Sequence, residues 1–309
     1  MNILITGGCG FIGSNFINNI LKDNDNIKIY NIDCLNYASN ESNVIYNSNY
    51  KFIKGNITNK DIVSYVLNEY KINYIIHFAA QTHVDNSFDK SLEYTIDNIY
   101  GTHILLQAAK EYGKIEKFLH FSTDEVYGEV DLEHPGCNEK SILNPTNPYA
   151  ATKAAAEFLV RSYYHSFKLP VIIIRCNNVY GPNQYPEKII PKFIKNLKEG
   201  KKLEIHGTGK TRRNFIWVDD VSIAIKLILE KGQINEIYNI GTNQEYSVLE
   251  IADILIKELT IDKHLENYIV FVKDRPFNDF RYSIDVSLLK SIGWKELHTN
   301  FIDNIKLLI

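Results

Sequence analysis

The sequence is poor in cysteine, the residue that would indicate a disulfide framework or a zinc site. Only four of its 309 residues are cysteines, and they are scattered with no C-x-x-C pair. This spacing is not typical of a metal site, so we predict no metal and reduced thiols. A chain of 309 residues is long enough to bury a core that needs no covalent staples.

An excess of charge of one sign and long apolar runs are also missing. The 34 Lys and Arg residues and 37 Asp and Glu residues give a net charge of −3, which provides no bulk attraction for nucleic acid or an anionic membrane. Any phosphate site must therefore be local. The first residues, 1–5, carry no basic side chain and soon reach glycine, which predicts a buried strand rather than a signal peptide or membrane span. We expect a cytoplasmic protein.

Short apolar runs alternate with amphipathic stretches through the first half of the chain. Alternation of this kind is typical of strands joined by crossover helices, with the strands parallel. We therefore predict an α/β fold with a doubly wound parallel sheet of the Rossmann type. Strands are expected at residues 2–6, 27–32, 51–53, 74–78, 118–121 and 171–175, and helices at 14–22, 61–70, 99–112 and 147–165.

Beyond residue 175 the alternation becomes less regular. Residues 177–191 are rich in Asn, Pro, Gly and aromatic residues, a composition typical of a loop. We predict a main domain over residues 1–175 and a smaller, discontinuous C-terminal lobe over 176–309, parts of which return to the main sheet. Helices are expected at 192–199, 219–231 and 248–259, and strands at 238–240, at 269–272 and just before Gly207.

A glycine-rich turn follows the first predicted strand. Gly7, Gly10 and Gly13 permit a tight turn and close backbone approach, so a pyrophosphate can lie at the N-terminus of the next helix. Asp33 ends the second predicted strand twenty residues after Gly13, where a carboxylate can accept the ribose hydroxyls and would repel a 2′-phosphate. Because no Lys or Arg directly follows Asp33, we predict NAD rather than NADP as the cofactor.

Further residues are placed to meet this cofactor. Asn56 lies just beyond the third predicted strand and can face the adenine edge, although an ordinary turn asparagine explains it nearly as well. Small residues at the end of the fourth strand suit a backbone that lies against the cofactor. The other predicted cofactor-binding residues are Phe11, Ile12, Ile57, Phe78, Ala79 and Ala80.

Tyr149 and Lys153 stand four residues apart on a predicted helix and therefore share one face. An ammonium group and a positive nicotinamide ring beside the phenol would favour phenolate and lower the pKa of Tyr149. This pair is suited to removing a proton from an alcohol that is being oxidised. Both residues are also expected to contact the cofactor.

Thr123, Asp124 and Glu125 follow the fifth predicted strand, at the sheet edge where catalytic groups of such folds lie. Two adjacent acids often mark a solvated turn, but here they lie between strand and cofactor. They predict a sugar that is oxidised, dehydrated and reduced in one site. Tyr149 would remove the 4-hydroxyl proton as C4 gives hydride to NAD. Glu125 would then remove the C5 proton while Asp124 protonates the departing 6-hydroxyl. Hydride would finally return to C6, and C5 would be reprotonated.

On these motifs the chain resembles the extended short-chain dehydrogenase/reductases, and among them the nucleoside-diphosphate-glucose 4,6-dehydratases. The Asp-Glu pair is the specific element, since related epimerases and decarboxylases lack it at this point. The resemblance implies the catalytic roles given above and a sugar-nucleotide substrate bound in the C-terminal lobe. The matching segments are GGCGFIG, HFAAQTHVDNSF, STDEVYGE, NPYAATKAAAE, NNVYGPNQYPEKIIPKFI, RNFIWVDD, YNIGT and DRPFNDFRYSID.

The same resemblance implies a set of substrate contacts. His83 is expected near the sugar, although a lone histidine is more often structural, and Asn178 is expected to meet the substrate. Glu187, Lys188 and Ile189 would frame the nucleotide base. Arg213, Asn239 and Arg275 would hold the diphosphate, for which the planar guanidinium is apt.

The nucleotide itself is less clearly indicated. Bacterial dTDP-glucose members of the family carry Asp where this chain has Asn56, and Arg-Pro-Gly-His where it has Arg-Pro-Phe-Asn at 275–278. Segments 81–87 and 177–180 are closer to eukaryotic UDP-glucose 4,6-dehydratases, such as the first domain of plant rhamnose synthases. UDP-glucose is therefore favoured over dTDP-glucose, with L-rhamnose synthesis as the pathway implied.

Other functions on the same fold remain open at this point. A sugar-nucleotide 4-epimerase or a uronate decarboxylase would also need Tyr149 and Lys153, but neither needs an acid beside Glu125 to expel a hydroxyl. A non-catalytic NAD-binding scaffold would be expected to lose these residues, and all are intact. The helices at 99–112 and 147–165 carry apolar residues on more than one face. Members of the family that the chain resembles pair such helices in a four-helix dimer interface, so the resemblance implies a homodimer, with burial inside one chain as the alternative.

Overall fold

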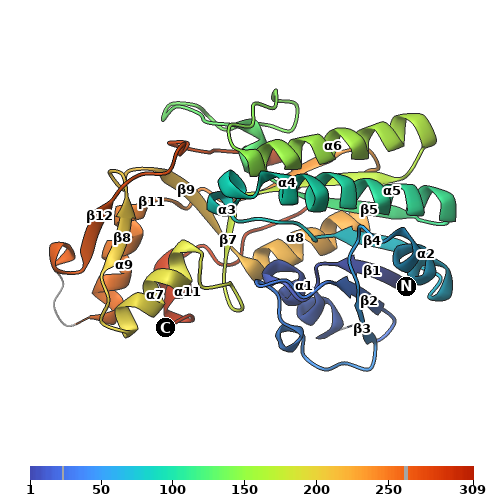
Figure 1. The fold of residues 1–309 in the computed structure, drawn as a ribbon, viewed down its shortest axis with the longest axis horizontal. Helices are drawn as coiled ribbons and strands as arrows, with labels where there is room; N and C mark the ends of the chain where they lie inside the picture. Colours follow the sequence, from blue (N-terminus) through green and yellow to red (C-terminus); the bar gives the residue numbers. More distant parts are fainter. Residues whose placement is uncertain (23, 261–263) are drawn as a thin grey trace.

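A parallel sheet forms the centre of the computed structural model, which describes residues 1–22, 24–260 and 264–309 (Figure 1). Its strands follow the order β10-β6-β5-β4-β1-β2-β3, and every neighbouring pair is parallel. The chain order reverses between β1 and β4, so a crevice for a ligand is expected at their carboxyl ends. The strands are β1 (Asn2–Thr6), β2 (Lys28–Asp33), β3 (Tyr50–Lys54), β4 (Tyr74–His77), β5 (Lys117–Thr123), β6 (Val171–Cys176) and β10 (Ile237–Ile240).

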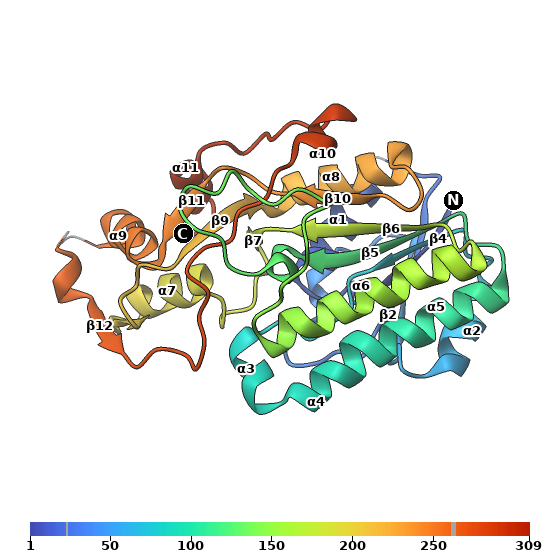
Figure 2. The ribbon, with the colours of Figure 1, turned by 90° about the horizontal axis from the view of Figure 1, so that it is seen from above.

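Helices cover both faces of this sheet, as the alternating pattern predicts (Figure 2). On one face α1 and α8 lie against each other, and on the other α5 lies between α2 and α6. Each face has its own buried apolar cluster. The helical segments are α1 (Phe11–Lys22), η1 (Glu41–Asn43), α2 (Lys60–Glu69), α3 (Val84–Asp89), α4 (Ser91–Tyr94), η2 (Thr95–Tyr100), α5 (Gly101–Tyr112), η3 (Asp124–Tyr127), α6 (Pro148–Phe167), α8 (Val218–Lys231) and α10 (Ser287–Ser291).

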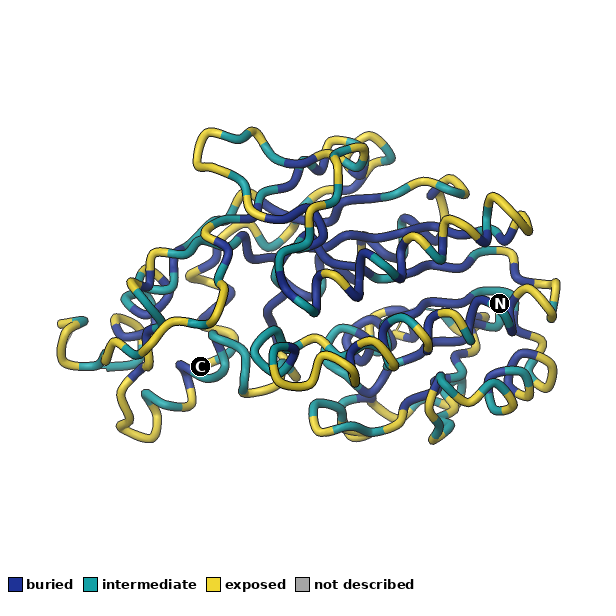
Figure 3. The backbone as a smooth tube through the Cα atoms, turned by 45° about the horizontal axis from the view of Figure 1, so that its top comes forward, coloured by how far each residue is buried: buried dark blue, intermediate teal, exposed yellow. Residues whose placement is uncertain are grey.

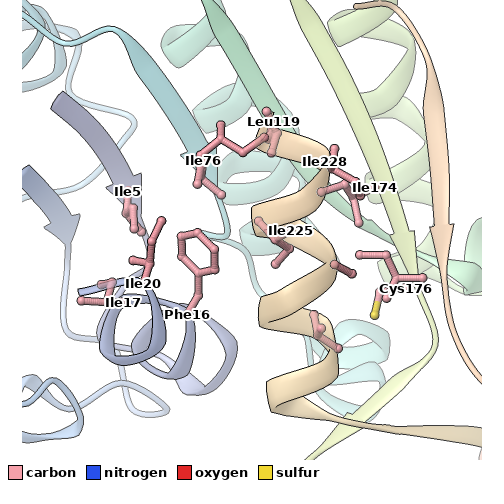
Figure 4. Packing of buried hydrophobic residues seen from close by; sticks show 14 of the residues in the cluster. Ile5, Phe16, Ile17, Ile20, Ile76, Leu119, Ile174, Cys176, Ile225 and Ile228 are labelled. Carbon is pink, nitrogen blue, oxygen red and sulfur yellow. The ribbon is translucent and has the colours of Figure 1, made fainter. Parts of the chain in front are cut away.

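The cluster under α1 and α8 shows how these helices are held. Phe16 and Ile17 of α1 point at the sheet, and Ile225 and Ile228 of α8 pack beside them (Figure 4). All four side chains are almost completely buried. Each buried side chain of this size contributes about 1.5–3 kcal/mol. The two helices are therefore fixed to strands that lie close to the glycine turn.

The remaining elements form two small sheets with their own core (Figure 1). In the first, β9 pairs in parallel with β7 and antiparallel with β11, and in the second β8 and β12 are parallel. Tyr180, Trp217 and Phe301 pack together in this core. These elements are β7 (Asn178–Tyr180), α7 (Ile189–Lys198), β8 (Leu203–His206), β9 (Arg212–Trp217), β11 (Glu245–Ser247), α9 (Val248–Leu259), η4 (Leu265–Asn267), β12 (Ile269–Val272) and α11 (Phe301–Lys306).

Two expectations for this part of the chain need correction. The stretch 177–191 is not only a loop, because it contains β7 and the start of α7. The strands β9 and β11 were not expected at all. The expectation that later segments return to the main sheet is confirmed by β10, which pairs with β6. The division at residue 175 stays a prediction, and β6 itself runs on to Cys176.

Burial follows the layers of the fold. The strands of the main sheet other than the edge strand β3 are buried along most of their length, whereas the outer faces of the helices are exposed (Figure 3). None of the helices in the described ranges combines the length and apolar character needed to cross a membrane. Within the same ranges, no group of three or more His, Cys, Asp and Glu residues is arranged to hold a metal ion.

Candidate active site

A cavity of about 450 Å³ lies at the carboxyl ends of the parallel strands and extends to the small sheets. Its volume is in the range typical of small-molecule sites. One half is lined by the glycine turn and by residues that follow β2, β3 and β4. The other half is lined by residues 184–193, by β8, β9 and α9, and by residues 275–282. All of the predicted cofactor residues and most of the predicted substrate residues therefore face one continuous space.

The glycine turn is shaped for close approach of a ligand. Gly7 has φ +73°, and a Cβ there would lie 2.6 Å from the amide nitrogen of Ala79. A Cβ on Gly13 would lie 2.6 Å from the carbonyl oxygen of Gly7. At Gly10 a Cβ would meet nothing closer than 3.3 Å, so the absence of a side chain there opens space above the start of α1. This is the geometry that a dinucleotide pyrophosphate requires.

The Asp33 carboxylate ends β2 at the edge of the cavity, as predicted. One oxygen accepts the backbone N–H of Cys9 at 2.9 Å, and the other accepts the N–H of Leu35 at 2.8 Å and the hydroxyl of Ser39 at 3.2 Å. These donors fix the carboxylate and leave acceptor capacity on its oxygens. A ribose with two hydroxyls fits beside it.

The other predicted cofactor residues also line the cavity. Asn56 does so while its side-chain oxygen accepts the N–H and the hydroxyl of Thr58, both at 2.9 Å. Its turn role and its cavity position are thus compatible. The complete lining set from this prediction is Gly7, Gly10, Phe11, Ile12, Gly13, Asp33, Asn56, Ile57, Phe78, Ala79, Ala80, Tyr149 and Lys153. The residues present therefore fit a dinucleotide cofactor.

Tyr149 and Lys153 lie one turn apart near the start of α6, whose N-terminus is capped by the side chain of Asn147. The Lys153 ammonium donates to the carbonyl of Phe121 at 2.7 Å, and the Tyr149 phenol is hydrogen-bonded to Thr123. Burial lowers the pKa of Lys153 to about 8. Burial also raises the pKa of Tyr149 well above its usual value, and the negative charge of Glu125 raises it further.

The expected lowering of the Tyr149 pKa included the charge of a bound nicotinamide ring, so it stays a prediction for the protein with its cofactor. The phenol is 7% exposed, so its charged form is poorly solvated, and both neighbouring carboxylates oppose a second negative charge. In the protein alone, these effects outweigh any stabilisation by Lys153. Additional positive charge beside the ring is needed before Tyr149 can act as a base.

Asp124 and Glu125 occupy different environments although they are adjacent. Glu125 lines the cavity and accepts the amide of Asn147 at 3.1 Å. Asp124 is 2% exposed, accepts the amide of Asn177 at 2.7 Å and does not line the cavity. Burial, together with the negative charge of Glu125, raises the pKa of Asp124 to about 7. Burial raises the pKa of Glu125 as well.

Such a pair can hold one proton near neutral pH. Two interacting carboxyl groups titrate as a pair. When their surroundings differ, their pKa values differ too, and the proton is bound mainly by the group with the higher pKa. Asp124 has the more buried carboxyl, and this burial favours the protonated form there. The donors Asn177 and Thr123 act in the opposite direction but do not outweigh the burial. The arrangement thus provides an acid and a base side by side.

Most of the predicted substrate residues are brought together as well. His83, Asn178, Glu187, Lys188, Ile189, Arg213 and Arg275 all line the cavity. Burial, together with the positive charge of Lys188, lowers the pKa of His83 to about 4, so the ring is neutral at physiological pH. The Arg275 guanidinium forms an ion pair with Asp85, with Nε–Oδ1 at 2.6 Å. The Arg213 guanidinium lies 4.3 Å from the ring centre of Tyr282.

Asn239 is the exception, and its predicted contact with a diphosphate does not fit the structure. The residue is completely buried in β10 and does not line the cavity. Its side-chain oxygen accepts the hydroxyl of Tyr127 at 2.8 Å, and its amide donates to the carbonyls of Cys137 and Asp285, each at 3.0 Å. All its hydrogen-bonding capacity is used in holding a loop against the sheet edge.

Several cavity residues were missed by sequence reasoning. Tyr37 donates to Glu187 at 3.2 Å, and Asp85 pairs with Arg275. Asp279 and Tyr282 lie beside Glu125 and Arg213. Asp85, Asp279 and Tyr282 stand in segments that carry the family resemblance, but no spacing singled them out. Their partners are distant in the sequence, and only the fold brings them together.

A buried ion pair lies behind the Tyr149–Lys153 helix. Arg175 and Glu157 are 2% and 1% exposed, and their closest approach is 2.6 Å. Glu157 follows Lys153 by one turn of α6, and its charge raises the pKa of Lys153 against the larger effect of burial. Arg175 also donates to the hydroxyl of Tyr127 at 2.8 Å. The pair therefore joins α6 to β6 and η3 beneath the site.

The model of the GDP-mannose 4,6 dehydratase family matches residues 4–305. The chain is 50% identical, over 99% of its length, to RHM2 of Arabidopsis thaliana. That protein is named a trifunctional UDP-glucose 4,6-dehydratase/UDP-4-keto-6-deoxy-D-glucose 3,5-epimerase/UDP-4-keto-L-rhamnose-reductase. The chain spans 46% of the length of that protein. The dTDP-D-glucose 4,6-dehydratase of Dictyostelium discoideum is 47% identical over 95% of the chain and 77% of its own length.

A solved structure shows the same similarity. The dTDP-glucose 4,6-dehydratase DesIV from Streptomyces venezuelae, crystallised with NAD, superposes with a TM-score of 0.93 at 36% identity. The alignment covers 99% of this chain and 94% of that one. The likeness extends over the main sheet and the small sheets alike.

Proposed function

Because the chain belongs to the GDP-mannose 4,6 dehydratase family, we propose that it is an NAD-dependent 4,6-dehydratase of a nucleoside-diphosphate glucose. The observation that carries this proposal is the acid–base pair Asp124 and Glu125 beside Tyr149 and Lys153. Oxidation of an alcohol needs only the second pair. Loss of water from the neighbouring carbons needs the first pair in addition.

The cofactor half of the cavity supports NAD. The glycine turn leaves room for a pyrophosphate, and the Asp33 carboxylate meets a ribose with free hydroxyls and repels a 2′-phosphate. NAD, when bound, supplies the hydride acceptor for C4 of the sugar and the hydride donor for C6. The protein contributes orientation and the movement of protons.

The proton transfers follow from the positions of the side chains. Tyr149, aligned by Thr123, takes the proton of the 4-hydroxyl. Lys153 lies one turn further along the same helix, and its positive charge would favour the phenolate. Glu125 faces the cavity and removes the C5 proton, which the new C4 ketone has acidified. When the hydride has returned to C6, the protonated Glu125 gives this proton back to C5. Asp124, with a pKa of about 7, gives a proton to the departing 6-hydroxyl. For this step its carboxyl must turn from Asn177 toward the cavity.

For the nucleotide we propose UDP-glucose, with dTDP-glucose as the competing substrate. The two bases differ by one methyl group, which a pocket discriminates only modestly. The Arabidopsis relative is named for UDP-glucose and the Dictyostelium relative for dTDP-D-glucose. The reaction would supply a 4-keto-6-deoxy sugar nucleotide for L-rhamnose or another deoxysugar. The epimerase and reductase activities in the Arabidopsis name are not proposed for this chain.

We also propose that the protein is a cytoplasmic homodimer with a cofactor domain over 1–175 and a substrate lobe over 176–309. An exposed apolar face supports the dimer: Leu92, Ile96, Tyr100 and Phe158 are 52–77% exposed on α4, η2 and α6, on the outer side of the sheet. The small-sheet core supports the second lobe.

One observation favours a second candidate function, a sugar-nucleotide 4-epimerase. Asp124 does not line the cavity, and an epimerase would use Tyr149 and Lys153 without it. Mass spectrometry of the products separates the two. The purified protein with NAD is given UDP-glucose and dTDP-glucose in parallel. A product lighter by one water, with no accumulation of NADH, supports the dehydratase. Conversion of the glucose nucleotide to its galactose isomer, at unchanged mass, would contradict the dehydratase proposal and support the epimerase.

A further inference from the structure

Asp279 lines the same cavity as Glu125, and its carboxylate has no role in the steps above. It lies in residues 273–282, which run from β12 past the small sheets and are called the strap below. Asp279 is 2% exposed, so its charge is almost fully withdrawn from water. A buried carboxylate is retained only where hydrogen bonds or charges compensate it. Its partners therefore indicate what it does.

One oxygen of Asp279 receives two hydroxyl donors. The Thr146 hydroxyl donates at 2.6 Å, and the Tyr282 hydroxyl donates to the same atom. Thr146 is 133 positions away in the sequence and directly precedes Asn147. The contact therefore joins the strap to the loop that leads into α6.

Asn147 is the residue through which this contact reaches the catalytic groups. Its side-chain oxygen accepts the N–H of Ala150 at 2.9 Å and so caps α6, which carries Tyr149. Its amide donates to Glu125 at 3.1 Å. A shift of the loop at Thr146 would thus displace the helix start and the base together.

The strap is held firmly on its other side. The carbonyl of Phe280 accepts the N–H of Arg212 at 2.7 Å, and the carbonyl of Arg281 accepts the N–H of Val130 at 3.0 Å. Arg213 stacks on Tyr282, the second donor to Asp279. Asp279 is therefore anchored to β9, from which Arg213 reaches the substrate half of the cavity.

We propose that Asp279 is a positioning residue for the dehydration, which places Glu125 and Tyr149 by joining the strap to the residue before Asn147. The inference rests on the proposed function and adds a residue to it. Misplacement of reacting groups by about 1 Å can cost about a hundredfold in rate, so such a contact matters. Asp279 acts through Thr146 and Asn147 and does not itself exchange a proton with the substrate.

The charge of Asp279 has a second consequence. Burial is the main cause of the raised pKa of Glu125, and the negative charge of Asp279 adds to it. Removing that charge lowers the pKa of Glu125 and makes it a weaker base. The other charged or titratable groups that face Glu125 are Arg213, Lys188, Asp124, Tyr149 and Tyr282.

Two variants separate the charge from the contact. Asp279→Asn keeps an oxygen that can accept from Thr146 and Tyr282 but removes the charge. Thr146→Val keeps the charge and removes the contact to the loop, and Thr146→Ser restores the hydroxyl. Asp89→Asn, an exposed carboxylate on α3, is the matched control for a simple change of net charge. The full chain with NAD is used throughout, and kcat and KM are measured from pH profiles with UDP-glucose and dTDP-glucose.

We expect the acid limb of the kcat profile to move to lower pH in Asp279→Asn, because Glu125 must be deprotonated to act and its pKa falls. Thr146→Val should lower kcat about tenfold without moving that limb, and Thr146→Ser should recover most of the loss. KM should change by less than about twofold in each variant, since no substrate contact is removed.

The outcomes that would overturn the inference are distinct. If Asp279→Asn and Thr146→Val both leave kcat and its pH profile unchanged, the contact between Asp279 and Thr146 positions neither Glu125 nor Tyr149. A rise in KM alone would make Asp279 a substrate-binding residue instead. If Asp279→Asn fails to fold, the inference is tested by the Thr146 variants alone, and an unchanged kcat in Thr146→Val would overturn it. If the wild-type protein removes no water from either sugar nucleotide, the proposed function is wrong and the inference falls with it.

Discussion

Replacing Asp124 with Asn removes the proposed acid while preserving its size and one of its acceptor oxygens. The Asp124 carboxyl is 2% exposed and has a pKa of about 7, so at neutral pH a large fraction of it carries a proton. Loss of a general acid typically costs about 10²–10⁴ in rate. We expect the dehydration rate of Asp124→Asn to fall by that factor.

The same variant should leave the first step in place. Oxidation at C4 depends on Tyr149 and Lys153, and Asp124 is linked to Tyr149 only through the long hydrogen bond from Thr123, which the Asn oxygen can still accept. Reduced cofactor should therefore accumulate when the variant is mixed with UDP-glucose, whereas the wild type shows none. Rapid-mixing absorbance of NADH measures this directly. Equal loss of oxidation and dehydration, or dehydration at the wild-type rate, would refute the assignment of Asp124 as the acid.

Stability provides an independent check on the same residue. The pKa of Asp124 rises from 3.8 to about 7 on folding. A carboxyl with a raised pKa in the folded state stabilises least at high pH, because the unfolded chain releases its proton first. A pKa shift of about 3 units corresponds to a destabilisation of the folded state by about 4 kcal/mol at most. This destabilisation is absent below about pH 4 and is fully present above about pH 7. Asp124→Asn should therefore raise the free energy of unfolding at pH 8 and not at pH 4. Denaturant titrations at both pH values that show no such difference would contradict the raised pKa.

Three further predictions concern the surroundings of the site. Glu157→Gln leaves the buried Arg175 guanidinium uncompensated and should lower the free energy of unfolding by about 3–5 kcal/mol, measured by denaturant titration; a loss below about 1 kcal/mol would contradict this. Gly13→Ala places a Cβ 2.6 Å from a backbone carbonyl, so the turn must shift, and calorimetry should show NAD affinity reduced by at least about tenfold; unchanged affinity would refute the close packing. Asp33→Asn keeps an acceptor for Cys9 but removes the charge that repels a 2′-phosphate, so the ratio of Kd for NADP to Kd for NAD should fall, and an unaltered ratio would argue against a role in cofactor choice.

Local patterns were sufficient to predict the main sheet and the cofactor site. The glycine spacing, the acid at the end of β2 and the four-residue spacing of Tyr149 and Lys153 each depend on a few neighbouring residues. Helix α6 begins at Pro148 after the Asn147 cap, one residue from the predicted start. Such features are encoded within one or two elements, so they can be recognised without the fold.

Features that depend on distant partners were not predictable in the same way. The three residues of β7 lie in a stretch with loop composition and become a strand only by pairing with β9. Asn239 was assigned to the substrate by resemblance, but its partners Tyr127, Cys137 and Asp285 enclose it at the sheet edge. The raised pKa of Tyr149 reflects burial, which the spacing of charged residues does not reveal.

The central claim is that one site oxidises C4, removes water across C5 and C6 and returns the same hydride to C6. UDP-glucose carrying deuterium at C4 tests this in a single turnover with the NAD-loaded protein. The account predicts a product lighter by one water with the deuterium at C6. Deuterium that remains at C4 would contradict it and indicate an epimerase, and deuterium retained on NADH would indicate a simple dehydrogenase.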